Sequence, residues 1–354
     1  MNDDGPEVPP RDRSRPAPRR RRPGRALTYV GIGVVAAMLV GLVADVVVLW
    51  TRPHRLDVSL PGSAPGGSTV LLVGTDSRAD DAGAGDDRRY GTEQDNPGER
   101  ADVVLAMRTD ADGTVRLLEV PRDLLVVGKK GAPVRLTTTL LDGPSGLTDS
   151  LCRSLGLGVD HVAEVRFPGL RSVVDAAGGV EVTTERPLRD TYTKFSLPAG
   201  RHVLDGNDAL AYVAARRVEV QQPDGTWVPD AASVGNRSSK GADVLRNLAE
   251  RTSVSPAHPV AAQRLAWAAA GAVAVDGKLS PTELPGLLGS FRKLATAPTL
   301  RLPVAQSGTV VPIARLQPGA GAVLAEFEGT APDGDGSGQG PCRARLPAAQ
   351  RGEG

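Results

Sequence analysis

The chain has 354 residues, with 42 Lys and Arg against 41 Asp and Glu, so its net charge is +1. No global positive field therefore predicts a nucleic-acid-binding protein, and we expect no nucleic-acid partner. Two cysteines and four scattered histidines give no spacing that is typical of a zinc site.

The basic residues are concentrated near the N-terminus. Residues 11–25 hold eight arginines among prolines. A segment of this composition cannot bury enough apolar surface to build a core, so residues 1–25 are predicted to be a disordered basic tail.

An apolar segment follows the basic tail, at Ala26–Trp50. Within it, Leu27–Ala44 gives 18 apolar or weakly polar residues, enough for a helix of roughly 27 Å. A buried soluble helix and a cleaved signal peptide are the alternatives, but the run is long for a signal peptide and no Ala-x-Ala site follows closely. The pattern favours an uncleaved transmembrane anchor over 26–50. Arginines on its N-terminal side predict a cytoplasmic N-terminus and an extracytoplasmic C-terminal part in a single-pass protein of the cell membrane.

Strand and helix signals alternate after a Pro-, Gly- and Ser-rich linker at 51–68. The apolar and alternating runs predict strands at Thr69–Val73, Asp102–Met107, Val115–Val120, Val162–Phe167, Val180–Thr184, Leu300–Val304 and Thr309–Ala314. Helical periodicity, caps and breakers predict helices at Leu147–Leu155, Pro168–Ala177, from the Asp205 cap to Arg216, at Lys240–Arg251, at Val260–Val275 and from the Ser280–Glu283 capping box to Leu294.

The polar region Val218–Ser239 is predicted to be a loop, and the Gly- and Pro-rich residues 331–354 a flexible tail. The alternation predicts an extracytoplasmic α/β domain over 69–330, a mixed sheet layered with helices and preceded by one transmembrane helix. Cys152 and Cys342 could pair outside the cytoplasm or remain two free thiols, and the sequence leaves both possibilities open.

Asp and Arg couples stand at three consecutive strand ends. Asp76 and Arg78 follow the first strand, Arg100 and Asp102 precede the second, and Pro121-Arg-Asp123 ends the third. Any one couple is typical of a solvated strand end or a surface ion pair. Three in succession indicate a site, because these ends can meet at one edge of a sheet, where ligands of open α/β folds bind.

The chemistry of these residues suits a pyrophosphate. Guanidinium groups bind its oxygens bidentately, and neighbouring carboxylates can hold Mg²⁺. Positioning and charge neutralisation supply most of the catalysis of phosphoryl transfer. Signatures of P-loop enzymes, serine hydrolases and zinc proteases are absent from the sequence.

At these residues the chain resembles the LytR-CpsA-Psr family of cell-envelope phosphotransferases. The motifs that carry the resemblance are Gly74-Thr-Asp76-Ser-Arg78, Arg100-Ala-Asp102, Val120-Pro-Arg122-Asp123, Phe167-Pro-Gly169, Val173–Val182, Leu197-Pro-Ala-Gly200 and Leu204–Val213. The likeness is dense from about 69 to 251 and looser to about 328.

The resemblance implies transfer of a glycopolymer from a polyprenyl-pyrophosphate carrier to peptidoglycan, with formation of a phosphodiester. It also implies a bound Mg²⁺ and an apolar pocket for the prenyl chain, which we expect under the helices Leu147–Leu155, Pro168–Ala177 and Lys240–Arg251. The catalytic residues it implies are Asp76, Arg78, Arg100, Asp102 and Arg122, with Asp76 and Asp102 as the metal ligands. The substrate-binding residues it implies are Arg135, Arg216, Arg237 and Lys240.

The second half of the family's site is divergent in this chain. Where the family has Arg-x-Arg after Tyr-Val, this chain reads Ala214-Ala-Arg216-Arg217, and the later arginine-rich motif becomes Ser233-Val-Gly-Asn-Arg237-Ser-Ser-Lys240. A non-catalytic module that binds polyprenyl phosphate or glycopolymer, or an envelope scaffold, is therefore the alternative to the transferase.

Overall fold

The computed structural model describes Tyr29, Asp45, 47–76, 98–230, 237–252, 259–308, 312–329 and Cys342. Two compact units divide the chain, Met1–Val48 and Leu49–Gly354, and the named strands and helices belong to the second. The basic tail and nearly all of the predicted anchor lie outside the described residues. No helix within those described is both long and apolar enough to cross a membrane.

The centre of the second unit is a seven-stranded mixed sheet. Its strands lie in the order β1 (His54–Leu56), β14 (Val273–Asp276), β7 (His161–Arg166), β2 (Gly67–Thr75), β3 (Ala101–Asp110), β4 (Val115–Val120) and β15 (Thr299–Arg301). The pairs β1–β14, β7–β2 and β4–β15 are parallel, and the other neighbours are antiparallel. The predicted mixed sheet is confirmed, and β3 and β4 form an antiparallel hairpin within it.

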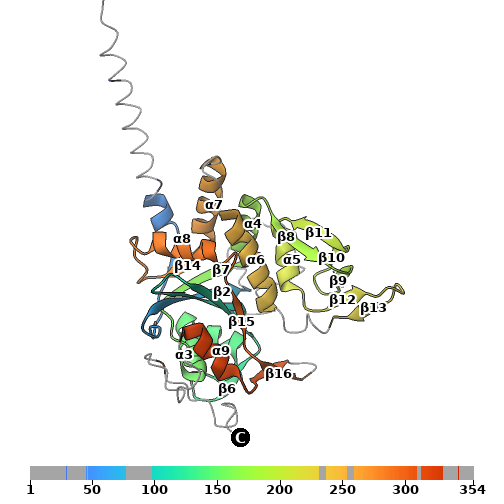
Figure 1. Cartoon of the computed structure of the whole chain (residues 1–354), viewed down its shortest axis with the longest axis horizontal. Coiled ribbons are helices and arrows are strands. Elements are labelled where there is room, and N and C mark those ends of the chain that lie inside the picture. Colours follow the sequence, from blue (N-terminus) through green and yellow to red (C-terminus); the bar gives the residue numbers. More distant parts are fainter. Residues whose placement is uncertain are drawn as a thin grey trace, which may run out of the picture. The chain divides into compact units, whose positions relative to one another are not determined.

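Both faces of this sheet are covered by helices (Figure 1). Leu71 and Val73 of β2 enter one apolar core, while Val70 and Leu72 enter the other, as expected of a strand buried on both sides. The first core contains α2 (Leu136–Thr139), α3 (Pro144–Leu155) and α9 (Ala320–Glu328). The opposite face is covered by α4 (Phe167–Ala176), α5 (Gly206–Ala214), α6 (Arg237–Thr252), α7 (Pro259–Ala272) and α8 (Leu284–Lys293).

The helix predicted at Leu147–Leu155 therefore lies on the wrong side for the role we expected of it. Leu147, Leu151 and Leu155 of α3 pack on the face opposite α4 and α6. A helical apolar pattern shows that a helix has a buried side but does not say which face of a sheet it covers. The pocket expected under three named helices is instead covered by α4 to α8.

The region predicted to be a loop at Val218–Ser239 contains two strands. These are β12 (Val218–Gln221) and β13 (Trp227–Pro229), which form a second sheet in the order β10–β9–β12–β13 with β9 (Leu188–Asp190) and β10 (Ser196–Leu197). Short two-stranded pairs complete the fold: β8 (Val180–Thr184) with β11 (Gly200–Leu204), β5 (Leu125–Val127) with β6 (Pro133–Arg135), and β16 (Val304–Ser307) with β17 (Ile313–Leu316). The strand predicted at Val180–Thr184 is confirmed as β8. β12 and β13 are only four and three residues long and show little periodicity, which is why the sequence did not predict them.

Three predicted boundaries are also corrected. The helix expected to reach Val275 ends at Ala272, because the next residues join the sheet as β14. The range 51–68 expected to be a linker contains β1. Glu283 does accept a hydrogen bond from the Ser280 N–H at 2.7 Å, but α8 begins only at Leu284.

Cys152 and Cys342 form a disulfide, with a Cα–Cα distance of 4.9 Å across 190 residues of sequence. Cys152 belongs to α3, and Cys342 is 1 % exposed. The bond therefore fixes one point of the C-terminal region against the first core.

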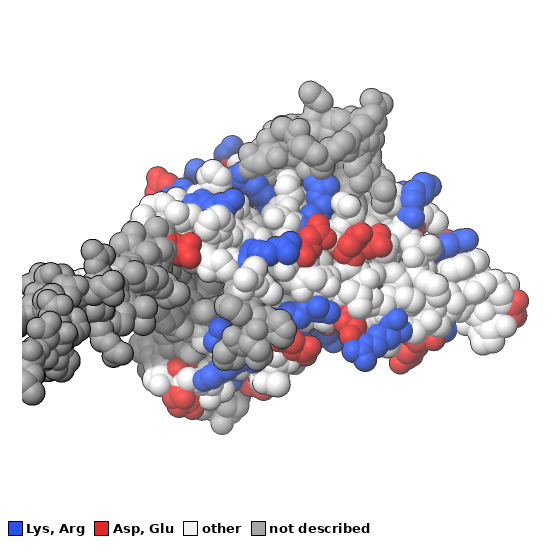
Figure 2. All heavy atoms as spheres, turned by 90° about the horizontal axis from the view of Figure 1, so that it is seen from above, with Lys and Arg blue, Asp and Glu red and all other residues white. Residues whose placement is uncertain are grey.

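Charged side chains of both signs alternate over the face of the molecule shown in Figure 2. Several Lys and Arg side chains lie directly beside Asp and Glu side chains on this face, with uncharged residues around these groups. Positive and negative side chains are therefore intermixed on this face, in keeping with the net charge of +1.

Candidate functional site

The three strand ends that carry Asp and Arg meet at one edge of the central sheet. β3 is antiparallel to both β2 and β4, so the end of β2, the start of β3 and the end of β4 lie side by side. Asp76, Arg100, Asp102 and Arg122 are thereby brought to the same edge, as the sequence predicted. Arg78 lies outside the described residues.

Asp76 is tied to Arg100 by two hydrogen bonds. The backbone N–H of Arg100 donates to Oδ1 of Asp76 at 2.9 Å, and the Asp76 N–H donates to the Arg100 carbonyl at 3.2 Å. Asp76 is 8 % exposed, so its carboxylate is held in a fixed, largely desolvated position. The backbone hydrogen bond from Arg100 thus positions this carboxylate at the sheet edge.

Asp102, near the start of β3, forms an ion pair with Arg122, which lies two residues after the end of β4. Nη1 of Arg122 donates to Oδ1 of Asp102, which is 5 % exposed. The Nε atom of Arg122 lies 3.6 Å from Asp123, whose other oxygen lies 3.4 Å from Nη1 of Arg135. Two arginines and two carboxylates therefore alternate along this edge, so Arg135 also lies at the predicted site.

A β-bulge directs Asp102 toward the face of the sheet that α4 to α8 cover. Val103 pairs with Gly74 and Ala101 pairs with Thr75, so the register shifts and Asp102 is the extra residue on β3. A bulge re-aims a side chain, and bulges are common beside active sites. Consecutive residues Asp102 and Val103 consequently both line the cavity on this face.

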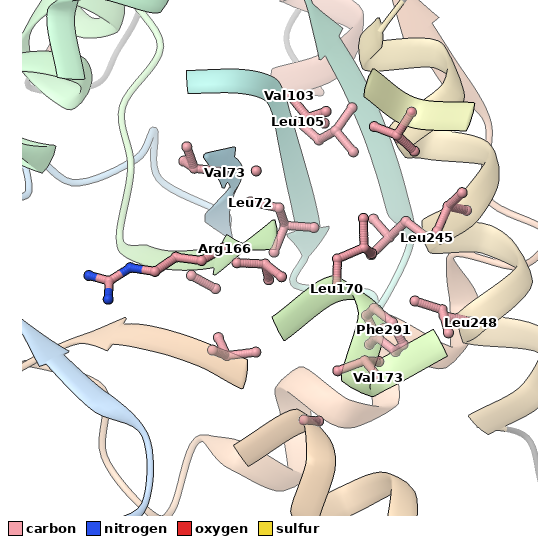
Figure 3. A pocket seen from close by; sticks show the side chains of 18 of the residues that line it. Leu72, Val73, Val103, Leu105, Arg166, Leu170, Val173, Leu245, Leu248 and Phe291 are labelled. Atoms are coloured by element: carbon pink, nitrogen blue, oxygen red, sulfur yellow. The ribbon is translucent and has the colours of Figure 1, made fainter. Parts of the chain in front are cut away.

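That cavity has a volume of about 460 Å³ and lies between the sheet and helices α4 to α8. Figure 3 shows apolar side chains such as Leu72, Leu170, Leu245, Leu248 and Phe291 around it. Its lining is almost entirely aliphatic or aromatic, and Asp102, Arg166 and Arg292 are its charged members. The space is therefore an apolar chamber whose sheet wall ends at the charged edge.

The first turn of α6 is anchored at the same edge. The hydroxyl of Ser238 donates to the carbonyl of Val120 at 3.0 Å, and Ser239 donates to Glu119 at 2.5 Å. Because these bonds join α6 to the end of β4, the N-terminus of a 16-residue helix lies next to Arg122. Backbone N–H groups at such a terminus favour an anion. Arg237 is the first residue of this helix.

Lys240 and Gly241 follow in the same turn and have different roles. Lys240 is 8 % exposed, and its Nζ lies 5.2 Å from the ring centroid of Tyr212 on α5. A Cβ on Gly241 would lie 2.6 Å from Cγ1 of Val103, so glycine allows α6 to approach β3 closely. Gly241 also lines the cavity, a role that the sequence reasoning missed.

Arg216, a predicted substrate-binding residue, contacts residues in and beside the second sheet. Its guanidinium stacks on Tyr192 at 4.6 Å from the ring centroid, and its backbone N–H donates to Asp190 at 3.0 Å. Burial would raise the pKa of Asp190, but hydrogen bonds from Thr193 and from the Arg216 and Arg217 N–H groups outweigh it and lower that pKa. No described contact joins Arg216 to Asp76, Asp102 or Arg122. Arg216 is thus held by the second sheet.

A buried acid beside the site was missed by sequence reasoning. Glu164 of β7 is 2 % exposed, with Oε1 at 3.6 Å from Nε of Arg166, and Arg166 pairs in register with Thr75 of β2. Figure 3 shows the Arg166 guanidinium pointing away from the apolar side chains of the cavity. Alternating charges within the strand Val162–Phe167 were the available signal.

The protonation of Glu164 should control stability near neutral pH. Burial raises its pKa from 4.5 to about 7, with repulsion from Glu99 adding to the shift and Arg166 opposing it. The folded chain therefore keeps a proton that the unfolded chain releases. The resulting stabilisation is full below pH 4.5 and is lost as pH rises through 7.

We expect Glu164→Gln to flatten the dependence of stability on pH in this window and to raise stability at pH above 7 relative to the unsubstituted chain. Thermal unfolding of the full chain in detergent at a series of pH values measures this. Glu99→Gln is the matched control, because it removes the repulsion between Glu99 and Glu164 and should shift the transition to lower pH. An unchanged pH dependence in Glu164→Gln would contradict the assignment.

The sequence and the fold both match known proteins. The model of the LytR_cpsA_psr family matches residues 51–225. The chain is 35 % identical over 194 residues to a probable cell wall biosynthesis protein, LcpB, of Corynebacterium glutamicum, covering 52 % of this chain and 46 % of that protein. It is 30 % identical over 158 residues to TagT of Bacillus subtilis, a polyisoprenyl-teichoic acid–peptidoglycan teichoic acid transferase, covering 43 % and 46 %. The chain thus spans about half the length of these curated relatives.

Solved structures agree over a larger part of the chain. The LytR-Csp2A-Psr enzyme from Actinomyces oris superposes with a TM-score of 0.65 and 30 % identity, covering 79 % of this chain and 97 % of that one. TagT bound to LIIa-WTA has the same fold, with a TM-score of 0.52 and 20 % identity, covering 78 % and 92 %. The family model matches residues 51–225, and the chain is 30 % identical to a solved LytR-Csp2A-Psr enzyme of which it covers 97 %. The chain therefore belongs to the LytR-CpsA-Psr family.

Proposed function

We propose that the protein transfers a glycopolymer from a polyprenyl-pyrophosphate carrier to peptidoglycan. The observation that carries this proposal is the apolar cavity whose sheet wall ends at the Asp76, Asp102 and Arg122 edge. An apolar chamber beside clustered guanidinium groups suits a ligand with a long hydrocarbon chain and a pyrophosphate head. The name of TagT, a teichoic acid transferase, supports the same substrate class.

The cavity would bind the prenyl chain. Its lining side chains come from nine elements, so it is built into the fold and does not need to form on binding. Each buried CH₂ group contributes about 0.8 kcal/mol to transfer out of water. Affinity should therefore grow with the length of prenyl chain that the cavity accommodates.

The charged edge would bind the pyrophosphate. Arg122 and Arg135 are held there by carboxylates, and the N-terminus of α6 adds backbone donors. Arg78, Arg100, Arg237 and Lys240 are proposed to add positive charge from the neighbouring segments. Carboxylate partners keep the guanidinium groups in place before the substrate arrives, which lowers the entropic cost of binding.

Asp76 and Asp102 fit the requirements of a Mg²⁺ site that is completed by substrate. Mg²⁺ is usually held by one or two carboxylates together with phosphate oxygens and water. Both carboxylates are buried at adjacent strand ends, while the described residues contain no group of three acidic, His or Cys side chains suited to a metal. Bound Mg²⁺ would neutralise charge that develops on the transferred phosphoryl group.

The reaction follows from this arrangement. A hydroxyl oxygen of peptidoglycan attacks the phosphorus that bears the glycopolymer, and the bond from that phosphorus to the bridging oxygen breaks. Polyprenyl phosphate leaves, and a phosphodiester forms between glycopolymer and peptidoglycan. One carboxylate at the edge accepts the hydroxyl proton, and the arginines hold the phosphates in line.

A specific observation favours a second function, a binding module without catalysis. Ala214 stands where the family has an arginine, is 6 % exposed, and lines the cavity with only a methyl group. Arg216, the other arginine of that motif, is stacked on Tyr192. If these changes remove turnover, lipid binding should persist without transfer.

Mass spectrometry of lipid that co-purifies with the detergent-extracted full chain tests the proposed ligand. We expect a polyprenyl phosphate or pyrophosphate species. Leu245→Trp places a larger side chain in the cavity and should deplete that species, because the hydrocarbon loses space. Val203→Trp, at an exposed position on β11 that does not line the cavity, is the matched control. Absence of any prenyl lipid from the unsubstituted chain would leave only a scaffold role.

We also propose that residues 26–50 anchor the protein in the cell membrane with the domain outside the cytoplasm. The Cys152–Cys342 disulfide supports this location, since such bonds persist in oxidising compartments. A reporter that is active only outside the cytoplasm, fused after residue 330, should be active. Activity from a cytoplasm-specific reporter at the same position would reverse the orientation.

A further inference from the structure

Exposed apolar side chains gather on two helices that cover the cavity. Among the described residues of the second unit, six large hydrophobic side chains are exposed, and four of them belong to α7 or α8. We define the α7–α8 surface by these four residues, Val260, Trp267, Leu284 and Leu288, which are 72 %, 40 %, 39 % and 47 % exposed. A concentration of this kind marks an interaction surface more often than scattered exposure does.

Helical spacing puts these residues on continuous faces together with basic side chains. Val260, Arg264 and Trp267 are separated by four and three residues on α7, and all three are exposed. Leu284, Leu288 and Arg292 are each four residues apart on α8. Apolar residues and arginines on one face are typical of a helix that lies in a lipid–water interface.

The inner sides of the same two helices form part of the cavity wall. Leu265 and Ala269 of α7 and Phe291 of α8 line the cavity. Leu288 and Arg292 of α8 are both exposed and part of the lining. The α7–α8 surface is therefore separated from the cavity by one layer of side chains.

The chain enters the domain next to this surface. The guanidinium of Arg52 lies 5.8 Å from the ring centroid of Trp267, and β1 pairs with β14, the strand that directly follows α7. Trp50, the last residue of the predicted anchor, contacts Arg55 at 4.1 Å. Trp50 and Arg52 are two positions apart in the sequence, a span of roughly 7 Å at most.

We infer that the α7–α8 surface docks on the outer face of the lipid bilayer. This inference rests on the proposed function and its membrane anchor. The apolar side chains would enter the headgroup region, Trp267 would lie at the interface, and Arg264 and Arg292 would contact lipid phosphates. Glu283, the acid at this end of α8, is hydrogen-bonded to Ser280. The docked domain would then take its prenyl substrate directly from the membrane, without passage of the hydrocarbon through water.

Single cysteines in the full chain test this docking. Both native cysteines are in the disulfide, so a thiol-reactive fluorophore labels only the introduced residue. Val260→Cys and Leu284→Cys report on the surface, while Val203→Cys and Leu141→Cys are controls at exposed apolar positions elsewhere. The labelled chains are reconstituted in vesicles of phosphatidylcholine and phosphatidylglycerol with brominated acyl chains.

Docking predicts blue-shifted emission and strong quenching by brominated lipid at positions 260 and 284 only. Equal, water-like emission at all four positions would overturn the inference. Energy transfer between donor- and acceptor-labelled chains, with no lipid quenching, would assign the surface to a second copy of the chain and would also overturn it. Lipid mass spectrometry on the same samples separates this failure from failure of the proposed function, because a chain can carry prenyl lipid with an undocked surface.

A charged variant provides a second readout. Val260→Glu combined with Leu284→Glu should lower transfer from a long-chain donor in the bilayer several-fold. Transfer from a water-soluble short-chain donor should be unchanged, since neither residue lines the cavity. If the double variant transfers the long-chain donor as fast as the unsubstituted chain does, the docking is contradicted.

Discussion

Replacing Arg122 by Ala should weaken binding of a polyprenyl pyrophosphate by roughly 10- to 100-fold. The substitution removes a guanidinium fork from the charged edge, and hydrogen bonds to charged groups contribute roughly 1.5–3 kcal/mol each. It also takes away the Arg122 partner of Asp102, a carboxylate that is 5 % exposed. The added negative field of Asp102 should then repel the pyrophosphate.

Equilibrium binding of the lipid to the detergent-solubilised full chain measures this effect. The affinity of Arg122→Lys should lie between those of the unsubstituted chain and Arg122→Ala, because an ammonium group keeps the charge but cannot reproduce the guanidinium fork. Arg116→Ala is the matched control, as Arg116 forms an ion pair with Asp110 at the opposite end of β4. Unchanged binding in Arg122→Ala would place the pyrophosphate elsewhere.

Replacing Asp76 by Asn should separate turnover from binding. The amide oxygen can still accept the hydrogen bond from the Arg100 N–H, so the loop geometry is retained while the charge is lost. We expect Mg²⁺-dependent transfer to fall by at least about 100-fold, the range typical of losing a proton acceptor or metal ligand. Lipid binding without metal should change little.

A transfer assay with a pyrophosphate-linked donor, run beside the binding assay, tests this separation. Asp160→Asn is a control at the other end of β2, where Asp160 accepts backbone hydrogen bonds from Ser63 and Thr69. Full transfer activity in Asp76→Asn would remove Asp76 from the proposed site. If the unsubstituted chain binds lipid but transfers no donor in the presence of Mg²⁺, the divergent 214–241 segment becomes the reason and the binding module is the better description.

The sequence alone determined the class of fold and which charged residues meet at one edge of the central sheet. Runs such as Val70–Val73 are apolar on both sides, so they predicted strands buried between layers. Asp76, Arg100, Asp102 and Arg122 stand within three residues of strand ends, and antiparallel pairing of consecutive strands brings such ends together whatever the rest of the chain does. Local signals were sufficient because neighbouring strands carry these residues.

Tertiary structure decided the features that depend on distant segments. The face of the sheet that α3 covers, the joining of β1 and β14 to one edge and the stacking of Arg216 on Tyr192 all depend on long-range packing. Glu164 acquires its raised pKa only because the fold buries it beside Glu99. The bulge at Asp102 and the close approach of Gly241 to Val103 form the cavity wall through contacts between elements far apart in sequence. The periodicity of a sequence indicates that a residue is buried. The residues that it contacts, and the effect of their charges on its pKa, depend on which helices and strands pack together.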